Sequence, residues 1–291
     1  MKDFLVSVLT PVYNGESHIA RLLDSVLGQT YSYIEMILAD DGSTDATVQI
    51  AEAYVPKFEE KGYSLTILSA AHKNASAAIN KGLAYINGEY LIWPDSDDEL
   101  LPDSVETRVR FLQQHPEYQC VRSVMEYVSG ETGAPAKPAE KLGDLEKTEI
   151  FLDVLESGSF VCCGCYMLRT EPFFRIYPSR KIPEYDVGQN FQMLLPFLYQ
   201  YQCPTINQQL SRVYVRKDSH SRCPLSKKEE ADKFKQFERL IDEITEICKI
   251  KDRAVLLRIA LWKARRRRYL AQKYHFFVNF TVITWRSNFY P

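Results

Sequence analysis

The sequence lacks a hydrophobic run long enough to act as a secretory signal or to cross a membrane. The N-terminal apolar stretch, residues 4–9, is too short for a signal peptide and leads directly into Thr10 and Pro11. The aromatic and β-branched tail, residues 275–285, falls short of the roughly 20 residues that a membrane-spanning helix needs. We therefore expect the protein to remain in the compartment where it is synthesised.

Cysteine is sparse and irregularly spaced. Seven cysteines, an odd number in 291 residues, do not form a disulfide framework and suit a reducing cytosol. Cys162 and Cys165 form one Cys-x-x-Cys without a second pair at zinc spacing, which favours buried free thiols over a metal or redox site. The formal net charge of −2 gives the molecule no field that would attract nucleic acid. We expect a cytoplasmic protein that binds no nucleic acid.

A glycine-rich phosphate-binding loop is also missing. No Gly-x-Gly-x-x-Gly follows the first apolar segment, and no lysine stands in a Walker-type loop. These absences argue against a dinucleotide-dependent enzyme and against a P-loop kinase.

What the sequence does contain is an alternation of strand and helix patterns over its first hundred residues. Short β-branched and apolar runs predict strands, and apolar residues at helical spacing between them predict helices. Because strands that alternate with helices form parallel sheets, ligands are expected at the carboxyl ends of the strands. The predicted strands cover residues 5–9 (ended by Pro11), 34–39, 65–68 and 90–93, and the predicted helices cover residues 19–27, 46–61 and 75–86. Later in the chain, residues 160–168 predict a further strand.

The last of these strands leads into three carboxylates within four residues, Asp95, Asp97 and Asp98. Such side chains repel one another unless a divalent cation lies between them, and Mg²⁺ and Mn²⁺ accept oxygen ligands of this kind. These ions keep coordination positions open for phosphates, so a diphosphate is the expected ligand. The alternative is a solvated acidic turn that caps a helix.

Polar residues also follow the first two predicted strands. Tyr13, within residues 10–14, could lie against a nucleobase, and the turn around it could hold ribose hydroxyls. Asp40 and Asp41 could accept hydrogen bonds from a base N–H or from ribose. The alternative for this second cluster is a polar turn that caps the next helix.

In their order and spacing, five segments of the chain resemble the nucleotide-sugar domain of family 2 glycosyltransferases. The resemblance covers residues 4–103 and extends more loosely to about residue 222. It implies a GT-A fold, which is a Rossmann-like α/β fold with a mixed sheet flanked by helices. It also implies an inverting, non-processive transfer from a nucleoside diphosphate sugar, most often a UDP-sugar, with Mg²⁺ or Mn²⁺. The segments are residues 6–14, 29–31, 39–45, 80–83 with 88–90, and 95–98.

The resemblance also assigns roles to individual positions. It implies that Asp97, together with Asp95, holds the metal ion. His220 is similar to a histidine in the segment that closes the family's catalytic domain. It could be a further metal ligand or, with Arg216 and Lys217, could neutralise the diphosphate; the alternative is an inert exposed histidine. The residues implied to contact the nucleoside are Pro11, Tyr13, Asp41 and Asp95, and Asn14, in the turn that holds Tyr13, is a further candidate.

Two segments depart from the family's pattern. Residues 74–80 carry no arginine, where the family commonly has a glycine-rich segment that contains one. Gln189 and Asn190 stand where the family usually has a Glu-Asp pair whose Asp is the catalytic base, and an amide cannot take a proton from the acceptor. We therefore name Asp186 as the candidate base, with Glu184 behind it. The alternative is that both are surface carboxylates and that the base lies elsewhere.

The residues from Ser226 onwards predict amphipathic helices, and the second stretch leads into four consecutive arginines, residues 265–268. Beside the aromatic tail, these arginines could make a peripheral contact with anionic lipid, which a lipid-linked acceptor would favour. The alternative is a helical subdomain whose arginines are solvated or paired with its own acidic residues.

Together these expectations describe a chain in two parts. Residues 1–222 form the GT-A catalytic domain, with nucleotide-sugar binding in residues 1–103 and the acceptor side in residues 104–222, and residues 223–291 form a helical extension. The expected function is the transfer of one sugar to a glycan or lipid-linked acceptor in envelope or capsular polysaccharide synthesis, in the cytoplasm or at the inner face of the cell membrane. The alternative is a nucleotide-sugar-binding sensor or assembly partner that has lost its catalytic base.

Overall fold

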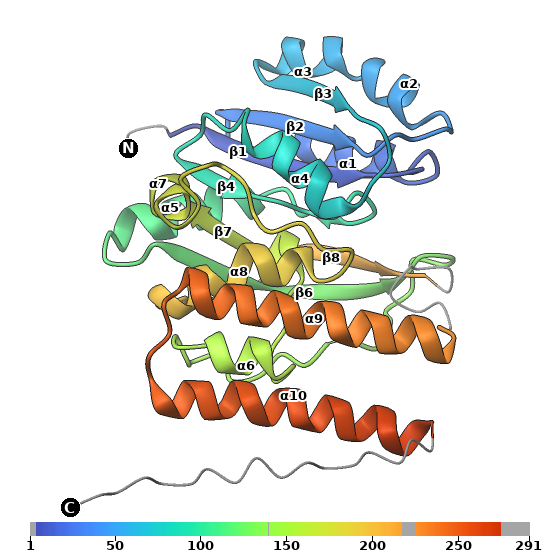
Figure 1. Cartoon of the computed structure of the whole chain (residues 1–291). Coiled ribbons are helices and arrows are strands. Elements are labelled where there is room, and N and C mark those ends of the chain that lie inside the picture. Colours follow the sequence, from blue (N-terminus) through green and yellow to red (C-terminus); the bar gives the residue numbers. More distant parts are fainter. Residues whose placement is uncertain (1–3, 139, 217–224, 275–291) are drawn as a thin grey trace, which may run out of the picture.

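A computed structural model gives the fold of the chain and describes residues 4–138, 140–216 and 225–274. Within these ranges the strands are β1 (Val6–Val12), β2 (Ile34–Asp40), β3 (Ser64–Ser69), β4 (Tyr90–Ile92), β5 (Glu99–Leu100), β6 (Cys120–Ser129), β7 (Tyr166–Arg169) and β8 (Thr205–Val215). They form one mixed sheet in the order β3-β2-β1-β4-β7-β6-β8-β5 (Figure 1). The first four strands in this order are parallel, and β7 runs antiparallel to both of its neighbours.

Helices cover the sheet and extend the molecule beyond it (Figure 1). They are α1 (Ile19–Leu27), α2 (Thr47–Glu52), α3 (Val55–Lys61), α4 (Ala75–Leu83), α5 (Ser104–Gln114), α6 (Phe151–Leu155), the 3₁₀ turn η1 (Cys163–Cys165), α7 (Thr170–Ile176), α8 (Gln189–Gln200), α9 (Lys227–Ile247) and α10 (Arg253–Lys273).

The parallel strands are buried on both faces, which explains their almost continuous apolar sequences. Val8 of β1 packs in the same cluster as Leu22 of α1, whereas the next residue, Leu9, packs with Ile79 of α4 on the other face. Successive side chains of a strand point to opposite faces, so each face needs its own covering helices. Helices on both faces leave the carboxyl ends of β1, β2 and β4 as the place where polar residues can gather.

The predicted end of the first strand at Pro11 is wrong, because β1 continues to Val12. Val6 N–H donates to Tyr33 on the β2 side, so by alternation the nitrogen of Pro11 faces the β4 side. The pairing of β1 with β4 ends at Val8, so the missing N–H of Pro11 removes no ladder bond.

Two other predicted elements are divided in the structure. The predicted helix at residues 46–61 forms two helices, α2 and α3, because Pro56 lies in the first turn of α3 and cannot donate to the preceding turn. The predicted strand at residues 160–168 forms a strand only from Tyr166, after the turn η1.

The C-terminal helices pack side by side beyond β6, and α10 lies farthest from the parallel strands (Figure 1). The arginine run divides among partners within the protein. Arg267 pairs with Glu238 at 2.6 Å, and Arg265 lies 3.8 Å from Glu156. Arg266 lies over the ring of Trp262, and its burial lowers its pKa to about 10. Of the helices that the structure describes, none combines the length and the apolar character needed to cross a bilayer.

Candidate active site

The loops after β1 and β2 meet at the carboxyl edge of the sheet. Asn14, which has a left-handed backbone (φ 49°), donates its N–H to Ser43 Oγ at 2.9 Å. Its side-chain oxygen accepts the N–H of Thr44 at 2.9 Å. Asn14 therefore fixes the second loop against the first, while the neighbouring ring of Tyr13 is 39% exposed.

Asp41, like Asp40 before it, is a buried carboxylate at this edge. Its N–H donates to Val12 at 2.9 Å, which continues the ladder between β1 and β2. Its side chain accepts the N–H of Lys73 at 3.0 Å and lies 2.8 Å from Nδ1 of His72. The imidazole of His72 in turn stacks on Tyr13, with ring centroids 4.0 Å apart and ring planes 18° apart.

Sequence reasoning missed His72 and Lys73. The available signal was their position just after the third predicted strand, since its carboxyl end reaches the same edge as those of the first two. Gly42 permits this approach: its φ is +79°, and a Cβ there would lie 2.7 Å from the backbone nitrogen of His72. A left-handed glycine thus brings the loop after β3 against the loop after β2.

The acidic segment follows β4 and is partly withdrawn from solvent. Thr10 donates to the carbonyl of Pro94 at 3.1 Å, which ties the end of β1 to the start of this segment. Burial, and then the nearby Asp97 carboxylate, raise the pKa of Asp95 to about 6. Burial raises the pKa of Asp98 well above its ordinary value, and the charges of the two neighbouring Asp residues add to this effect. The segment is a cluster of repelling acids with poor solvation.

Cationic side chains surround Asp97. Arg216 donates to Asp97 Oδ2 at 2.7 Å, and Arg21 of α1 donates to the Asp97 carbonyl at 2.5 Å. Arg21 also lies over the ring of Tyr214, 3.5 Å from its centroid. The Nε of Arg21 is buried without a hydrogen-bond partner among the described residues. Sequence reasoning named Arg216 but missed Arg21, whose place on an amphipathic helix gives no signal of its own.

The residues present fit a divalent ion that is shared with a substrate. Within residues 4–138, 140–216 and 225–274, no group of three or more His, Cys, Asp or Glu side chains is arranged to hold a metal. Mg²⁺ and Mn²⁺ need only one or two protein carboxylates when substrate phosphates and water complete the shell. Asp95 and Asp97 supply such oxygens, and a cation there would relieve their repulsion. His220 and Lys217 lie outside the described residues.

The candidate bases lie beside α4. Asp186 accepts from the side chain of Asn74 at 2.9 Å and from that of Gln236 on α9 at 3.3 Å. Glu184 pairs with Lys73 and accepts from Asn80 at 3.2 Å, and these hydrogen bonds, Lys73 first, lower its pKa. The structure thus joins both acids to the loop that carries His72, and Asp186 is the one that forms no ion pair among the described residues.

Asn190, in the first turn of α8, does not match an ordinary surface amide. Its side-chain oxygen is buried and has no hydrogen-bond partner among the described residues. An unpaired buried carbonyl oxygen is costly, so the position offers an acceptor that none of the described residues fills. This is the position at which the family resemblance implies the catalytic carboxylate.

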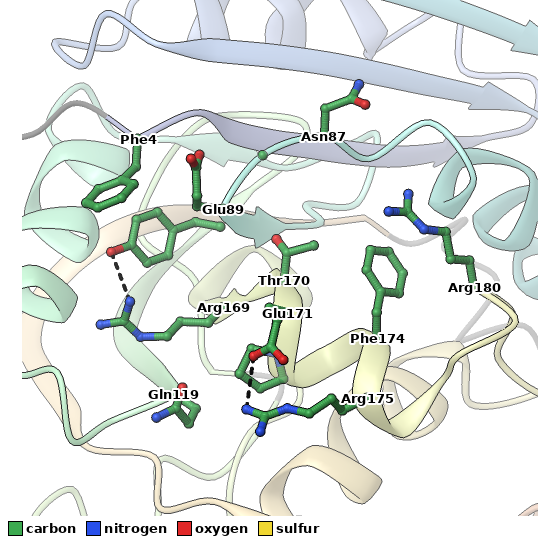
Figure 2. Close-up of a pocket in the computed structure, with 13 residues that line it drawn as sticks. Phe4, Asn87, Glu89, Gln119, Arg169, Thr170, Glu171, Phe174, Arg175 and Arg180 are labelled. Carbon is green, nitrogen blue, oxygen red and sulfur yellow. Dashed lines mark hydrogen bonds and ion pairs between the residues drawn. The ribbon is translucent and has the colours of Figure 1, made fainter.

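A pocket of about 680 Å³ lies at the opposite edge of the sheet, where β4 begins and β7 ends. Figure 2 shows the residues that line it. Its polar walls are largely paired: Arg169 donates to the hydroxyl of Tyr90 at 3.4 Å, and Arg175 lies 3.0 Å from Glu171. Because the loops that carry Asp41 and Asp97 leave the other edge, this pocket is not part of the candidate active site.

Comparison with known proteins places the fold. S. aureus TarS 1-349 in complex with UDP-GlcNAc has a TM-score of 0.65 at 20% identity, over 92% of this chain and 71% of that chain. The mannosyltransferase PcManGT from Pyrobaculum calidifontis, in complex with GDP-Man and Mn²⁺, has a TM-score of 0.61 at 16% identity, over 94% of this chain and 75% of that chain. The predicted GT-A fold with C-terminal helices is confirmed.

Comparison of sequences identifies the family. EpsE of Bacillus subtilis (strain 168), which bears the name of a glycosyltransferase, is 31% identical over 177 residues, which are 61% of this chain. The chain spans about 60% of the length of EpsE. The family described as glycosyl transferase family 2 matches residues 7–176, which is more than half of the chain. The protein therefore belongs to glycosyltransferase family 2.

Proposed function

We propose that this protein transfers one sugar from a nucleoside diphosphate sugar, with UDP as the nucleotide, to a hydroxyl of a glycan or lipid-linked acceptor. The configuration at the anomeric carbon inverts, and the product belongs to an envelope or capsular polysaccharide. The proposal rests on three features that meet at one edge of a parallel sheet. They are the exposed ring of Tyr13, the buried carboxylate of Asp41 and the acidic segment at residues 95–98. UDP-GlcNAc in the complex of TarS supports the choice of nucleotide.

The nucleoside end of the donor is held by the first two loops. Tyr13 offers a ring for stacking, and Asp41 accepts an N–H from the base. Uracil and guanine carry such an N–H at the ring position between two carbonyl or amino groups, whereas cytosine carries a bare acceptor there. A carboxylate at this point therefore favours UDP or GDP over CDP. Pro11 and Asn14 shape the loop that positions Tyr13.

The diphosphate end faces the acidic segment. Asp97 and Asp95 would hold Mg²⁺ or Mn²⁺, which supplies positive charge to the leaving diphosphate. Arg216 and Arg21 already lie at Asp97 and can take over part of the phosphate charge when the donor arrives. These two cations replace the arginine that is missing from residues 74–80.

The acceptor hydroxyl must lose a proton as it attacks the anomeric carbon from the side opposite the diphosphate. Asp186 is the proposed base, because it is exposed and its partners Asn74 and Gln236 are neutral. Glu184 is tied to Lys73 in an ion pair, which makes it a weaker base and a positioning residue for the loop.

A turnover assay tests the proposal and separates it from the alternative of a nucleotide-sugar sensor. The protein is incubated with a panel of UDP-sugars, Mn²⁺ and extracts of envelope glycolipid, and UDP release is measured. Release that depends on both metal and acceptor supports an enzyme. Donor binding without release in the presence of any acceptor supports the sensor and overturns the proposal.

We also place the acceptor at a membrane surface. The outer face of α10 exposes Leu257 (60%) and Leu261 (42%), and Arg268, about two turns further along the same helix, is also exposed. Apolar side chains next to arginine suit contact with anionic lipid. Co-sedimentation with vesicles containing phosphatidylglycerol should fall when both leucines are changed to Gln. Equal sedimentation of variant and wild type would remove this part of the proposal.

A further inference from the structure

His72 makes two interactions that a nucleobase would make at the same site. Its planar ring stacks on Tyr13 at 4.0 Å. Its Nδ1 lies 2.8 Å from the Asp41 carboxylate and 3.1 Å from the Asp41 carbonyl. Both partners are acceptors only, so Nδ1 carries the proton and donates. A ring that stacks on Tyr13 and donates an N–H to Asp41 reproduces the contacts proposed above for uracil.

The backbone holds His72 at this place. On the N-terminal side of His72, Ala70 N–H donates to the Asp40 carbonyl at 3.1 Å. On its C-terminal side, Lys73 N–H donates to the Asp41 carboxylate at 3.0 Å. Gly42 lies directly against its nitrogen. The main chain at residue 72 is therefore fixed next to Asp41, and only the side chain can leave.

The side chain of His72 is free to move outwards. It is 53% exposed, whereas the carboxylate that it touches is 6% exposed. An exposed ring exchanges between rotamers easily, so it can leave the buried acceptor when a better-fitting ring arrives. A molecule whose site is filled by His72 cannot bind the base. The apparent affinity for the base is therefore reduced in proportion to the fraction of molecules whose site is free.

We propose that His72 occupies the nucleobase position of the free protein and is displaced from Tyr13 and Asp41 when a uracil-type base binds. The inference rests on the proposed function, because it takes these two residues as the base site. The imidazole thereby keeps the buried Asp41 hydrogen-bonded while no donor is present, and it sets the donor concentration at which the site fills.

The test is calorimetry with UDP and Mn²⁺ on the wild type and on His72→Ala. Removing the internal competitor should tighten UDP about threefold to tenfold. A matched control is His115→Ala, because His115 also packs against an aromatic ring, Phe111 with centroids 4.5 Å apart, and also lies beside a carboxylate, Glu117 at 3.2 Å. That variant should bind UDP like the wild type.

Weaker or unchanged UDP binding by His72→Ala overturns the inference, and weaker binding would make His72 a wall of the bound site. Failure of both proteins to bind any nucleotide overturns the proposed function and this inference with it. A second readout follows the imidazole of the wild type by ¹H–¹⁵N NMR. UDP should remove the hydrogen-bonded Nδ1–H signal of His72, and its persistence at saturating UDP contradicts displacement.

Discussion

Arg216 donates a hydrogen bond to Asp97 Oδ2 over 2.7 Å, so a guanidinium lies on the carboxylate that we expect to share a metal with the donor. A cation in this place can pass from carboxylate to phosphate when the metal and the donor arrive together. The arrangement makes the diphosphate, rather than the nucleoside, the part of the donor that depends on Arg216.

Changing Arg216 to Ala should therefore weaken UDP by roughly tenfold to a hundredfold, because a charge-assisted hydrogen bond to phosphate is lost. Binding of uridine, which lacks phosphates, should change little. Both are measured by calorimetry with Mn²⁺. Arg110→Ala is the control, since Arg110 pairs with Glu106 on the exposed face of α5. An equal loss for uridine and UDP would show that Arg216 only supports the fold.

Changing Asp186 to Asn should lower sugar transfer at least a hundredfold while UDP binding survives, because the amide cannot take the acceptor's proton. Glu184→Gln should cost less, since that side chain is committed to Lys73. Asn190→Asp provides the rival test: if the base belongs at the start of α8, this change should raise the rate and make Asp186 dispensable. Retained activity in Asp186→Asn refutes its role as the base.

Changing Gly42 to Ala should destabilise the protein. A left-handed backbone costs a non-glycine residue roughly 1–2 kcal/mol, and here the new Cβ would also lie 2.7 Å from the His72 nitrogen. Gly62→Ala is the control, because Gly62 has a similar φ of +81° with nothing within 4 Å of the added carbon. Thermal unfolding should show a larger loss of stability for Gly42→Ala than for Gly62→Ala. Equal effects would mean that the loop contact is unimportant.

The stability of the folded protein should depend on pH through Asp98. Its pKa in the folded protein is raised by burial first and by the charges of Asp95 and Asp97 second. Because this carboxyl holds its proton more tightly in the folded protein than in the unfolded chain, the folded protein loses stability as the pH rises. The loss begins near the unfolded pKa of about 4 and is complete above the folded pKa. Asp98→Asn removes this loss, so without metal its melting temperature should exceed that of the wild type by a few degrees at pH 8 and match it near pH 4.

The control for the pH series is Asp103→Asn, because Asp103 lies at the surface and accepts from Gln208 at 2.7 Å. Its melting temperature should follow the wild type, apart from a constant offset. The difference in melting temperature between Asp98→Asn and the wild type should therefore grow from pH 4 to pH 8. A difference that shrinks or reverses would contradict the burial of an ionisable carboxyl at this position.

Much of the fold could be predicted because the signals were local. The β-branched runs of β1, β2 and β4 and the acidic segment after β4 are continuous in sequence, and their order fixes a shared edge. The division of α2 from α3 follows from Pro56, a local signal that the periodicity obscured. The continuation of β1 through Pro11 depends on where β4 stops, which no local pattern records.

The site was harder to predict where it depends on contacts between distant segments. Tyr13 and His72 come together only because Gly42 lets two loops touch, and Arg21 reaches residue 97 from an ordinary amphipathic helix. The arginines at residues 265–268 are a second case in which contacts between distant segments could not be predicted. Their charge is plain in the sequence, but the pairing of Arg265 with Glu156 and of Arg267 with Glu238 is fixed by helix packing.

We expect the acidic segment and the Tyr13 edge to form one metal-dependent nucleotide site. Calorimetry of the purified protein with UDP, GDP and CDP, each with Mn²⁺ and with EDTA, tests it most directly beside an Asp97→Ala variant. We expect UDP to bind with Mn²⁺, to bind much more weakly with EDTA, and to lose the metal dependence in the variant, with CDP the weakest of the three. Absence of binding by all three nucleotides, or binding that neither EDTA nor Asp97→Ala alters, would show that these residues do not form such a site.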